Sequence, residues 1–147
     1  MSTLNNHHSH LTVADVMLPM AKTPQTSGRT LLKEALELMD KNRLGIVCIT
    51  DFEGTLQGII TDGDIRRMLS SVQKPLAALM NDDVIAHAIK SPTTVMASSS
   101  LKYAIDIMGK KQIWDLPVVE QGKLRGLLHL HPAIKAIIGA SNDDEFS

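Results

Sequence analysis

The chain has 147 residues, of which 44% are hydrophobic, 21% charged and 3% aromatic, and its 15 basic and 16 acidic side chains give a formal charge of −1. This is the composition of a folded domain, and it excludes a nucleic-acid or membrane surface that depends on bulk positive charge. The single cysteine excludes an internal disulfide and a multi-cysteine zinc site. We expect a cytoplasmic protein, as the cysteine count favours, with no nucleic acid as a partner, as the charge balance and scarce aromatics indicate. No membrane partner is expected either, because no apolar run approaches the ~20 residues of a membrane span.

Residues 1–10 are polar and contain His7, His8 and His10. They lack the apolar core of a signal peptide. We expect a flexible tail here rather than a metal site, because nothing nearby in the sequence would fix the histidine ligands.

The rest of the chain consists of two copies of one unit. Residues 32–39 and 101–108 share Leu, Lys, Ala and Met at matching places, at a constant offset of 69 residues. Both segments carry apolar residues at helical spacing and are predicted helices. Thr30 is the expected N-cap of the first helix, and Ser99 or Ser100 is the expected N-cap of the second.

In each copy the helix is followed by a strand, a turn with glycine, a second strand and a second helix. Apolar, β-branched segments predict strands at 45–50 and 56–60 in the first copy and at 116–120 and 124–128 in the second, with closing helices at 63–72 and 132–138. In the second copy, a short extended segment at 94–96 precedes the first helix. Gly139 is expected to stop the last helix.

The copies divide the chain into successive segments. We expect a tail at 1–10, repeat 1 at 11–72, a linker at 73–83, repeat 2 at 84–139 and an acidic tail at 140–147. Within the linker, residues 75–80 are predicted to form a short helix with Pro75 at its first position. Two repeats of this size can bury together an aliphatic face that neither could bury alone.

The order of these elements, the repeat length and several strings resemble the cystathionine-β-synthase-type (CBS) domain pair, also called the Bateman module. The strings are ADVM at 14–17, EALELM at 34–39, GIITDGD at 58–64 and LPVV at 116–119, and the resemblance extends from residue 11 to residue 139. It implies an α/β (α+β) fold of two βαββα repeats related by a pseudo-twofold axis. It also implies a homodimer, because such pairs usually dimerise into a flat disk.

A narrower resemblance concerns two short segments. Residues 61–67, TDGDIRR, resemble the first CBS repeat of bacterial arabinose-5-phosphate isomerases and a similar string in CBS pairs linked to sugar nucleotidyltransferases. Residues 126–131, GLLHLH, resemble the second repeat of the isomerases. In those enzymes the pair follows a sugar-isomerase domain that these 147 residues do not include. We therefore expect either an excised tail or a free-standing relative.

Thr61 and Asp64 are the first candidate ligand-binding residues. Thr61 ends a predicted strand, and Asp64 lies three residues later in the first turn of a helix. This spacing forms a helix capping box. In CBS domains the same pair points into the cleft between repeats, where the aspartate accepts hydrogen bonds from both ribose hydroxyls, so the resemblance implies a nucleotide ligand. The two roles can coexist.

Arg66 and Arg67 follow on the same predicted helix. A guanidinium can hold a phosphate through two parallel hydrogen bonds. Adjacent helical residues are ~100° apart, so at most one of the two faces the ligand. The alternative for both is a solvated helix face.

The second copy departs from the pattern, because His129 and Pro132 stand where the first copy has Thr61 and Asp64. Proline offers no side-chain acceptor to a ribose, so we expect one competent site in the chain, or none. His129 and His131 are further candidate ligand-binding residues. Hydrogen bonding to a ligand is preferred over a metal pair, since no carboxylate or cysteine lies nearby in the sequence.

Other chemistry-bearing residues are expected to be structural. Cys48 is predicted to be a buried thiol, Trp114 to be a packing residue rather than a platform for a nucleobase, and Asp82 to lie in a solvated turn. The sequence has no nucleophile elbow, P-loop or dinucleotide-binding glycine pattern, so no catalytic residues are assigned.

The preferred function is a regulatory module that binds AMP, ADP, ATP or a CMP-sugar and passes a conformational change to a partner such as a sugar isomerase or another catalytic domain. One alternative is a structural dimerisation module without a ligand. Another is the CBS pair of a sugar-nucleotidyltransferase-type protein. An enzyme in its own right is the least favoured hypothesis.

Overall fold

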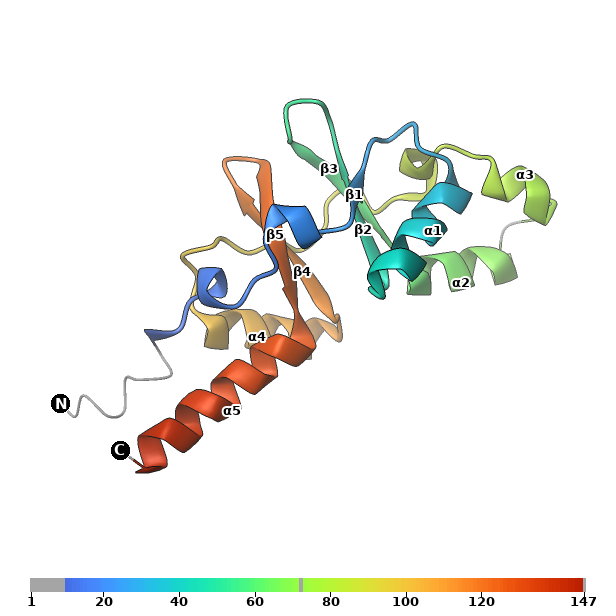
Figure 1. Ribbon diagram of the computed structural model, residues 1–147. Coiled ribbons are helices and arrows are strands. Elements are labelled where there is room, and N and C mark those ends of the chain that lie inside the picture. Colours follow the sequence, from blue (N-terminus) through green and yellow to red (C-terminus); the bar gives the residue numbers. More distant parts are fainter. Residues whose placement is uncertain (1–9, 72, 147) are drawn as a thin grey trace. The chain divides into compact units, whose positions relative to one another are not determined.

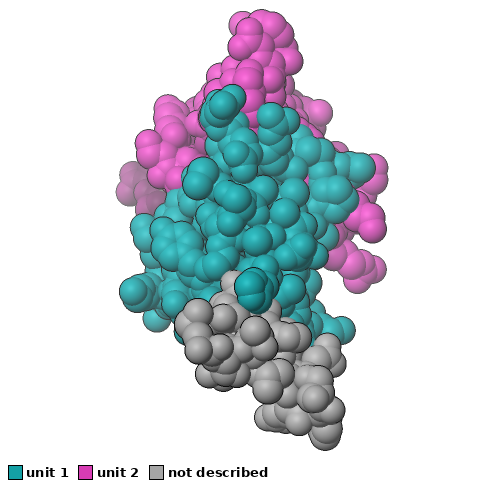
Figure 2. All heavy atoms as spheres, turned by 90° about the vertical axis from the view of Figure 1, so that its left-hand side faces the viewer, with its two compact units in different colours: residues 1–21, 93–121, 125–147 teal, residues 22–92, 122–124 magenta. Residues whose placement is uncertain are grey.

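The computed structural model describes residues 10–71 and 73–146, with side chains up to residue 139 (Figure 1). The chain forms two compact units, which Figure 2 shows in teal and magenta. Of the described residues, unit 1 comprises 10–21, 93–121 and 125–146, and unit 2 comprises 22–71, 73–92 and 122–124. The repeats predicted from the sequence follow chain order, whereas the units exchange two lead-in segments, residues 13–21 and 84–92.

Unit 2 contains a three-stranded sheet with helices packed against it. Its elements are β1 (Gln25–Thr26), α1 (Leu32–Asn42), β2 (Ile46–Thr50), β3 (Leu56–Thr61), α2 (Asp62–Ser71), α3 (Leu76–Met80) and the 3-10 helix η5 (Val84–His87). The central strand β2 pairs with β1 in parallel and with β3 antiparallel. Every residue of β2 is buried, Cys48 included, which confirms the buried strand and thiol predicted here. α3 is present, but Pro75 is its N-cap instead of its first helical residue.

The core of unit 2 is aliphatic, as the composition predicts. α1 buries Leu32, Ala35 and Met39, which recur at helical spacing on one face. The residues that complete this core come from β2, β3, α2, α3 and η5: Val47, Ile49, Ile60, Ile65, Met68, Leu79 and Val84. Full burial of each large aliphatic side chain contributes about 1.5–3 kcal/mol. Because Ile60 of β3 and both Ile65 and Met68 of α2 belong to this cluster, their packing fixes the junction between β3 and α2.

The start of α1 differs from the prediction. Leu31, and not Thr30, is the N-cap, and Glu34 Oε1 accepts a hydrogen bond from the Leu31 N–H at 3.2 Å. The next backbone group, the Leu32 N–H, donates to the carbonyl oxygen of Asp82 at 2.9 Å. The Leu32 N–H has no partner within the helix, and the carbonyl oxygen of Asp82 satisfies it in place of a threonine N-cap.

Unit 1 contains the second helix–strand–strand–helix arrangement. Its elements are η3 (Val13–Asp15), α4 (Leu101–Lys111), β4 (Asp115–Glu120), β5 (Lys123–His129) and α5 (Leu130–Phe146), and η4 (Met20–Lys22) lies where the chain passes into unit 2. β4 and β5 form a two-stranded sheet, to which the segment at 94–96 adds a single parallel bridge, Val95 to Val118. Ser100 is the N-cap of α4, as predicted, and its hydroxyl oxygen accepts a hydrogen bond from the Tyr103 N–H at 3.1 Å.

The prediction for the last helix was wrong at both ends. α5 begins at Leu130 and continues through Gly139 to Phe146, so residues 140–146 are helical. Among the described residues the glycines with positive φ are Gly54 and Gly122, both in hairpin turns. A glycine ends a helix efficiently when it adopts that left-handed conformation, and otherwise costs only about 1 kcal/mol relative to alanine. None of the helices in the described part of the chain is long and apolar enough to cross a membrane.

Each lead-in segment crosses a strand at a glycine. In unit 2, Ile59 and Ile89 exchange two backbone hydrogen bonds, of 3.0 and 2.8 Å, beside Gly58. A Cβ on Gly58 would lie 2.7 Å from the Ile89 carbonyl oxygen. In unit 1, Gly126 occupies the equivalent place beside the carbonyl oxygen of Leu18. Both crossings therefore require a residue without a side chain.

Candidate functional site

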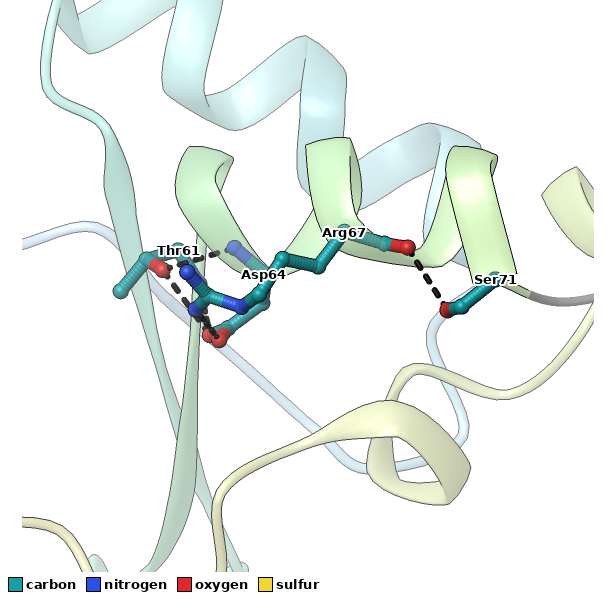
Figure 3. Close-up of polar contacts among 4 residues, drawn as sticks. All are labelled: Thr61, Asp64, Arg67 and Ser71. Carbon is teal, nitrogen blue, oxygen red and sulfur yellow. Dashed lines mark hydrogen bonds and ion pairs between the residues drawn. The ribbon is translucent and has the colours of Figure 1, made fainter.

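The best-formed candidate site lies where β3 ends and α2 begins (Figure 3). The Thr61 N–H and hydroxyl both donate to Asp64 Oδ2, at 3.0 and 2.9 Å. In return, the Asp64 N–H donates to Thr61 Oγ1 at 3.2 Å. This is a complete capping box, so the structural role predicted for the pair is present.

The two arginines of α2 differ in their surroundings. Arg67 reaches back along the helix, and its Nη2 donates to Asp64 Oδ1 at 2.6 Å, as Figure 3 shows. The Arg67 side chain is 66% exposed, whereas that of Asp64 is only 12% exposed. Arg66 is exposed on the same helix. The structure thus brings Thr61, Asp64 and Arg67 together and leaves Arg66 on the solvated face.

A groove lies in unit 2 between the end of α1 and the start of α2. Its lining residues are Leu36, Met39, Asp40, Arg43, Leu44, Gly45 and Asp62. Thr61 and Asp64 do not belong to this lining. The groove and the capping box are therefore separate features of unit 2.

The counterpart in unit 1 is a hydrogen-bonded pair of side chains that sequence spacing does not reveal. His129 Nδ1 lies 2.8 Å from Asp115 Oδ1, and the side chains are 29% and 10% exposed. Asp115 begins β4 and His129 ends β5, so antiparallel strands bring together residues that are 14 positions apart. Sequence analysis missed Asp115 because its partner lies on the neighbouring strand. An acid at the start of a strand whose hairpin partner ends in histidine is the signal that could have found it.

Other candidates in unit 1 are exposed. His131 is exposed in the first turn of α5. Trp114 is 69% exposed, so its prediction as a packing residue was wrong. Its carbonyl oxygen accepts a hydrogen bond from the Leu130 N–H at 2.9 Å, which ties the backbone to α5 while the indole remains outside the core.

The sequence raised two possible metal sites, at the N-terminal histidines and at His129 and His131. Among the described side chains, no group of three or more His, Cys, Asp or Glu residues could hold a metal ion. His7 and His8 lie outside the described residues, and His10 is exposed. The acidic side chains of 143–145 also lie outside the described set.

Asp82 forms a polar cluster instead of the solvated turn predicted for it. Its Oδ1 accepts a hydrogen bond from Lys74 Nζ at 2.7 Å, and its Oδ2 lies 2.8 Å from His87 Nε2. The hydrogen bond from Lys74, followed by that from His87, lowers the pKa of the Asp82 carboxyl below its ordinary value of 3.8. The cluster joins the segments before and after α3.

Comparison with known proteins identifies similar chains. Arabinose 5-phosphate isomerase KdsD of Yersinia pestis is 28% identical over 126 residues, which cover 86% of this chain and 37% of the isomerase. A homoserine O-acetyltransferase of Methanocorpusculum labreanum is 33% identical over 110 residues, covering 75% of this chain and 20% of the enzyme. The chain thus spans less than half the length of these curated relatives.

Solved structures match over almost the whole chain. The crystal structure of CBSX2 in complex with AMP has a TM-score of 0.77 at 27% identity, covering 88% of this chain and 97% of that one. CBSX2 from Arabidopsis thaliana, in a second structure, has a TM-score of 0.78 at 26% identity and covers 90% and 97%. The model of the CBS domain matches twice, at residues 12–71 and 76–138. The two matches, the two helix–strand–strand–helix arrangements and these neighbours confirm the resemblance: the chain belongs to the CBS domain family, as a tandem pair.

Proposed function

We propose that unit 2 binds the ribose of an adenosine nucleotide, AMP, ADP or ATP, at the junction of β3 and α2, and that binding regulates a catalytic partner. The observation that carries this proposal is the Asp64 carboxylate, which is 12% exposed and fixed in orientation by the Thr61 N–H and hydroxyl. A preorganised acceptor loses little conformational freedom when a ligand hydroxyl binds to it. CBSX2, at 27% identity, has been crystallised with AMP, which supports an adenosine ligand.

A nucleotide-activated sugar such as a CMP-sugar is the second ligand class of this proposal. Its ribose offers the same pair of hydroxyl donors to Asp64, so the recognition chemistry is shared. The similarity to an arabinose 5-phosphate isomerase favours a sugar-phosphate isomerase as the regulated partner. The similarity to an acetyltransferase shows that such a segment also occurs in an enzyme of another class. A nucleotidyltransferase-type partner is the alternative that the resemblance of residues 61–67 suggests.

Regulation requires that the ligand bind two states of the protein with different affinities. We assign that role to the chain and assign no catalytic residue to it. We further propose that the chain acts as a homodimer, and its single cysteine favours the cytoplasm.

A structural dimerisation module is the competing function. The completeness of the capping box favours it, because Thr61 and Asp64 satisfy each other without any ligand. Pro132, which offers no acceptor at the equivalent place in unit 1, favours it as well.

The test compares two aspartates in matched capping boxes. Asp15 accepts hydrogen bonds from the Thr12 N–H and hydroxyl, at 2.8 and 3.1 Å, as Asp64 does from Thr61. Asp64→Ala and Asp15→Ala should each cost about 1 kcal/mol of unfolding free energy through loss of a cap. Calorimetric titration should show that AMP binding is abolished by Asp64→Ala and retained by Asp15→Ala.

A thermal-shift screen with AMP, ADP, ATP and a CMP-sugar precedes this comparison. A ligand at 100 times its dissociation constant should stabilise the protein by about 2.7 kcal/mol. If none of them shifts the melting temperature, or if Asp64→Ala lowers stability without changing affinity, the structural module becomes the better description.

A further inference from the structure

We propose that Arg67 is a specificity residue that competes with ribose for Asp64 and, when displaced, binds the phosphate of a nucleotide. The proposal rests on the proposed function of the Asp64 site. It concerns which ligands that site prefers: Arg67 makes it select nucleoside 5′-phosphates over nucleosides.

The Asp64 carboxylate can accept only a limited number of hydrogen bonds. A carboxylate offers about four lone-pair positions, two on each oxygen. Both positions on Oδ2 accept hydrogen bonds from Thr61, and one position on Oδ1 accepts the bond from Arg67. One position is left, whereas the two hydroxyls of a ribose need two.

Asp64 therefore has too few free acceptor positions for a ribose while Arg67 is bound to it. A ribose that binds through both hydroxyls must displace Arg67 from Oδ1. Displacement is feasible because Arg67 is 66% exposed and is held by this contact at the end of a long side chain. Exposed ion pairs are weak, so the competition should reduce the affinity for a plain nucleoside by about two- to fivefold.

The displaced guanidinium carries several N–H donors and matches a phosphate group with two parallel hydrogen bonds. The guanidinium lies over the first turn of α2, where a Cβ on Gly63 would meet Arg67 Nη1 at 3.6 Å. A nucleotide with a 5′-phosphate near this turn replaces the lost ion pair, and a nucleoside does not.

The experiment titrates adenosine, 2′-deoxyadenosine and AMP into the wild-type chain and two variants. Arg67→Gln removes the competitor, and Arg66→Gln removes the same charge from the adjacent, exposed position. For Arg67→Gln we expect adenosine to bind about two- to fivefold more tightly and AMP more weakly. Arg66→Gln should change the ratio of AMP to adenosine affinity by less than about twofold.

The deoxynucleoside separates competition for acceptors from a general loss of charge. A single ribose hydroxyl can use the remaining position on Oδ1, so Arg67 does not oppose 2′-deoxyadenosine. Its affinity should stay constant in Arg67→Gln, and the preference for adenosine over 2′-deoxyadenosine should rise. If the nucleosides bind but both affinity ratios are the same in Arg67→Gln as in Arg66→Gln, the role of Arg67 is refuted and the proposed function stands. If neither nucleosides nor AMP bind the wild-type chain, the role of Arg67 is refuted, and the proposed function then depends on the other ligands of the thermal-shift screen.

Discussion

Replacement of Gly58 by alanine should break the crossing between β3 and the lead-in segment 84–92. The new Cβ would lie 2.7 Å from the Ile89 carbonyl oxygen, well inside ordinary contact distance, and that oxygen belongs to backbone that cannot rotate away. The strands must separate, which weakens the hydrogen bonds of 3.0 and 2.8 Å between Ile59 and Ile89. Each such bond contributes about 0.5–1.5 kcal/mol, and overpacking costs a further 1–3 kcal/mol. We expect Gly58→Ala to lower the free energy of unfolding by about 2–6 kcal/mol.

The assay is urea unfolding followed by circular dichroism, with hydrogen exchange at the Ile89 amide as a local readout. Gly109→Ala is the matched control, because a Cβ there would have nothing within 4 Å. That control should stabilise α4 by about 0.5–1 kcal/mol, since alanine is the better helix former. A Gly58→Ala protein within about 0.5 kcal/mol of wild type, or unchanged exchange at Ile89, would refute the argument.

Two further predictions concern pH and assembly. Because the pKa of Asp82 is lowered in the folded state, its contribution to stability is present above the ordinary pKa of 3.8 and is lost as pH falls through the folded-state value. The difference in unfolding midpoint between wild type and Asp82→Asn should thus shrink as pH falls below about 4, and a difference that grows on this acidification would contradict the prediction. Sedimentation should show a species of twice the 16.0 kDa chain mass. The reason is that large apolar side chains are exposed in the single chain and would be buried in a dimer; Leu69, Leu76 and Ile138 are 57%, 60% and 54% exposed. A 16.0 kDa species alone at tens of micromolar would argue against the homodimer.

The helices and strands were predictable because they depend on local periodicity. α1 and α4 carry their buried residues at helical spacing, and β2 is a continuous apolar segment. The ends of elements were less predictable. Leu31 caps α1 because the adjacent Leu32 N–H pairs with Asp82, some 50 residues away, and that contact leaves no local signal.

In the candidate site, too, local contacts were predictable and contacts between distant residues were not. The box formed by Thr61 and Asp64 is encoded by residues three positions apart, so it could be predicted and was found. The pair of Asp115 and His129 depends on the register of a hairpin, which a single sequence does not specify at that distance. The contact of Arg67 with Asp64 has the i,i+3 spacing of neighbours on a helix, which Arg66 lacks, so it was predictable, but the sequence analysis considered both arginines only as phosphate ligands.

The exchange of lead-in segments makes the linker a determinant of folding. Unit 2 is completed by residues 84–92, which follow the linker, and unit 1 takes residues 13–21 from the start of the chain. A chain cut between the repeats would leave neither unit within one fragment, and the units could become complete only if the two fragments associated and each supplied the lead-in segment that the other lacks. The covalent link keeps each segment at an effective concentration in the millimolar range for a short tether. Lengthening the linker should therefore weaken folding only slightly, whereas cutting it should make folding a bimolecular reaction whose midpoint depends on protein concentration.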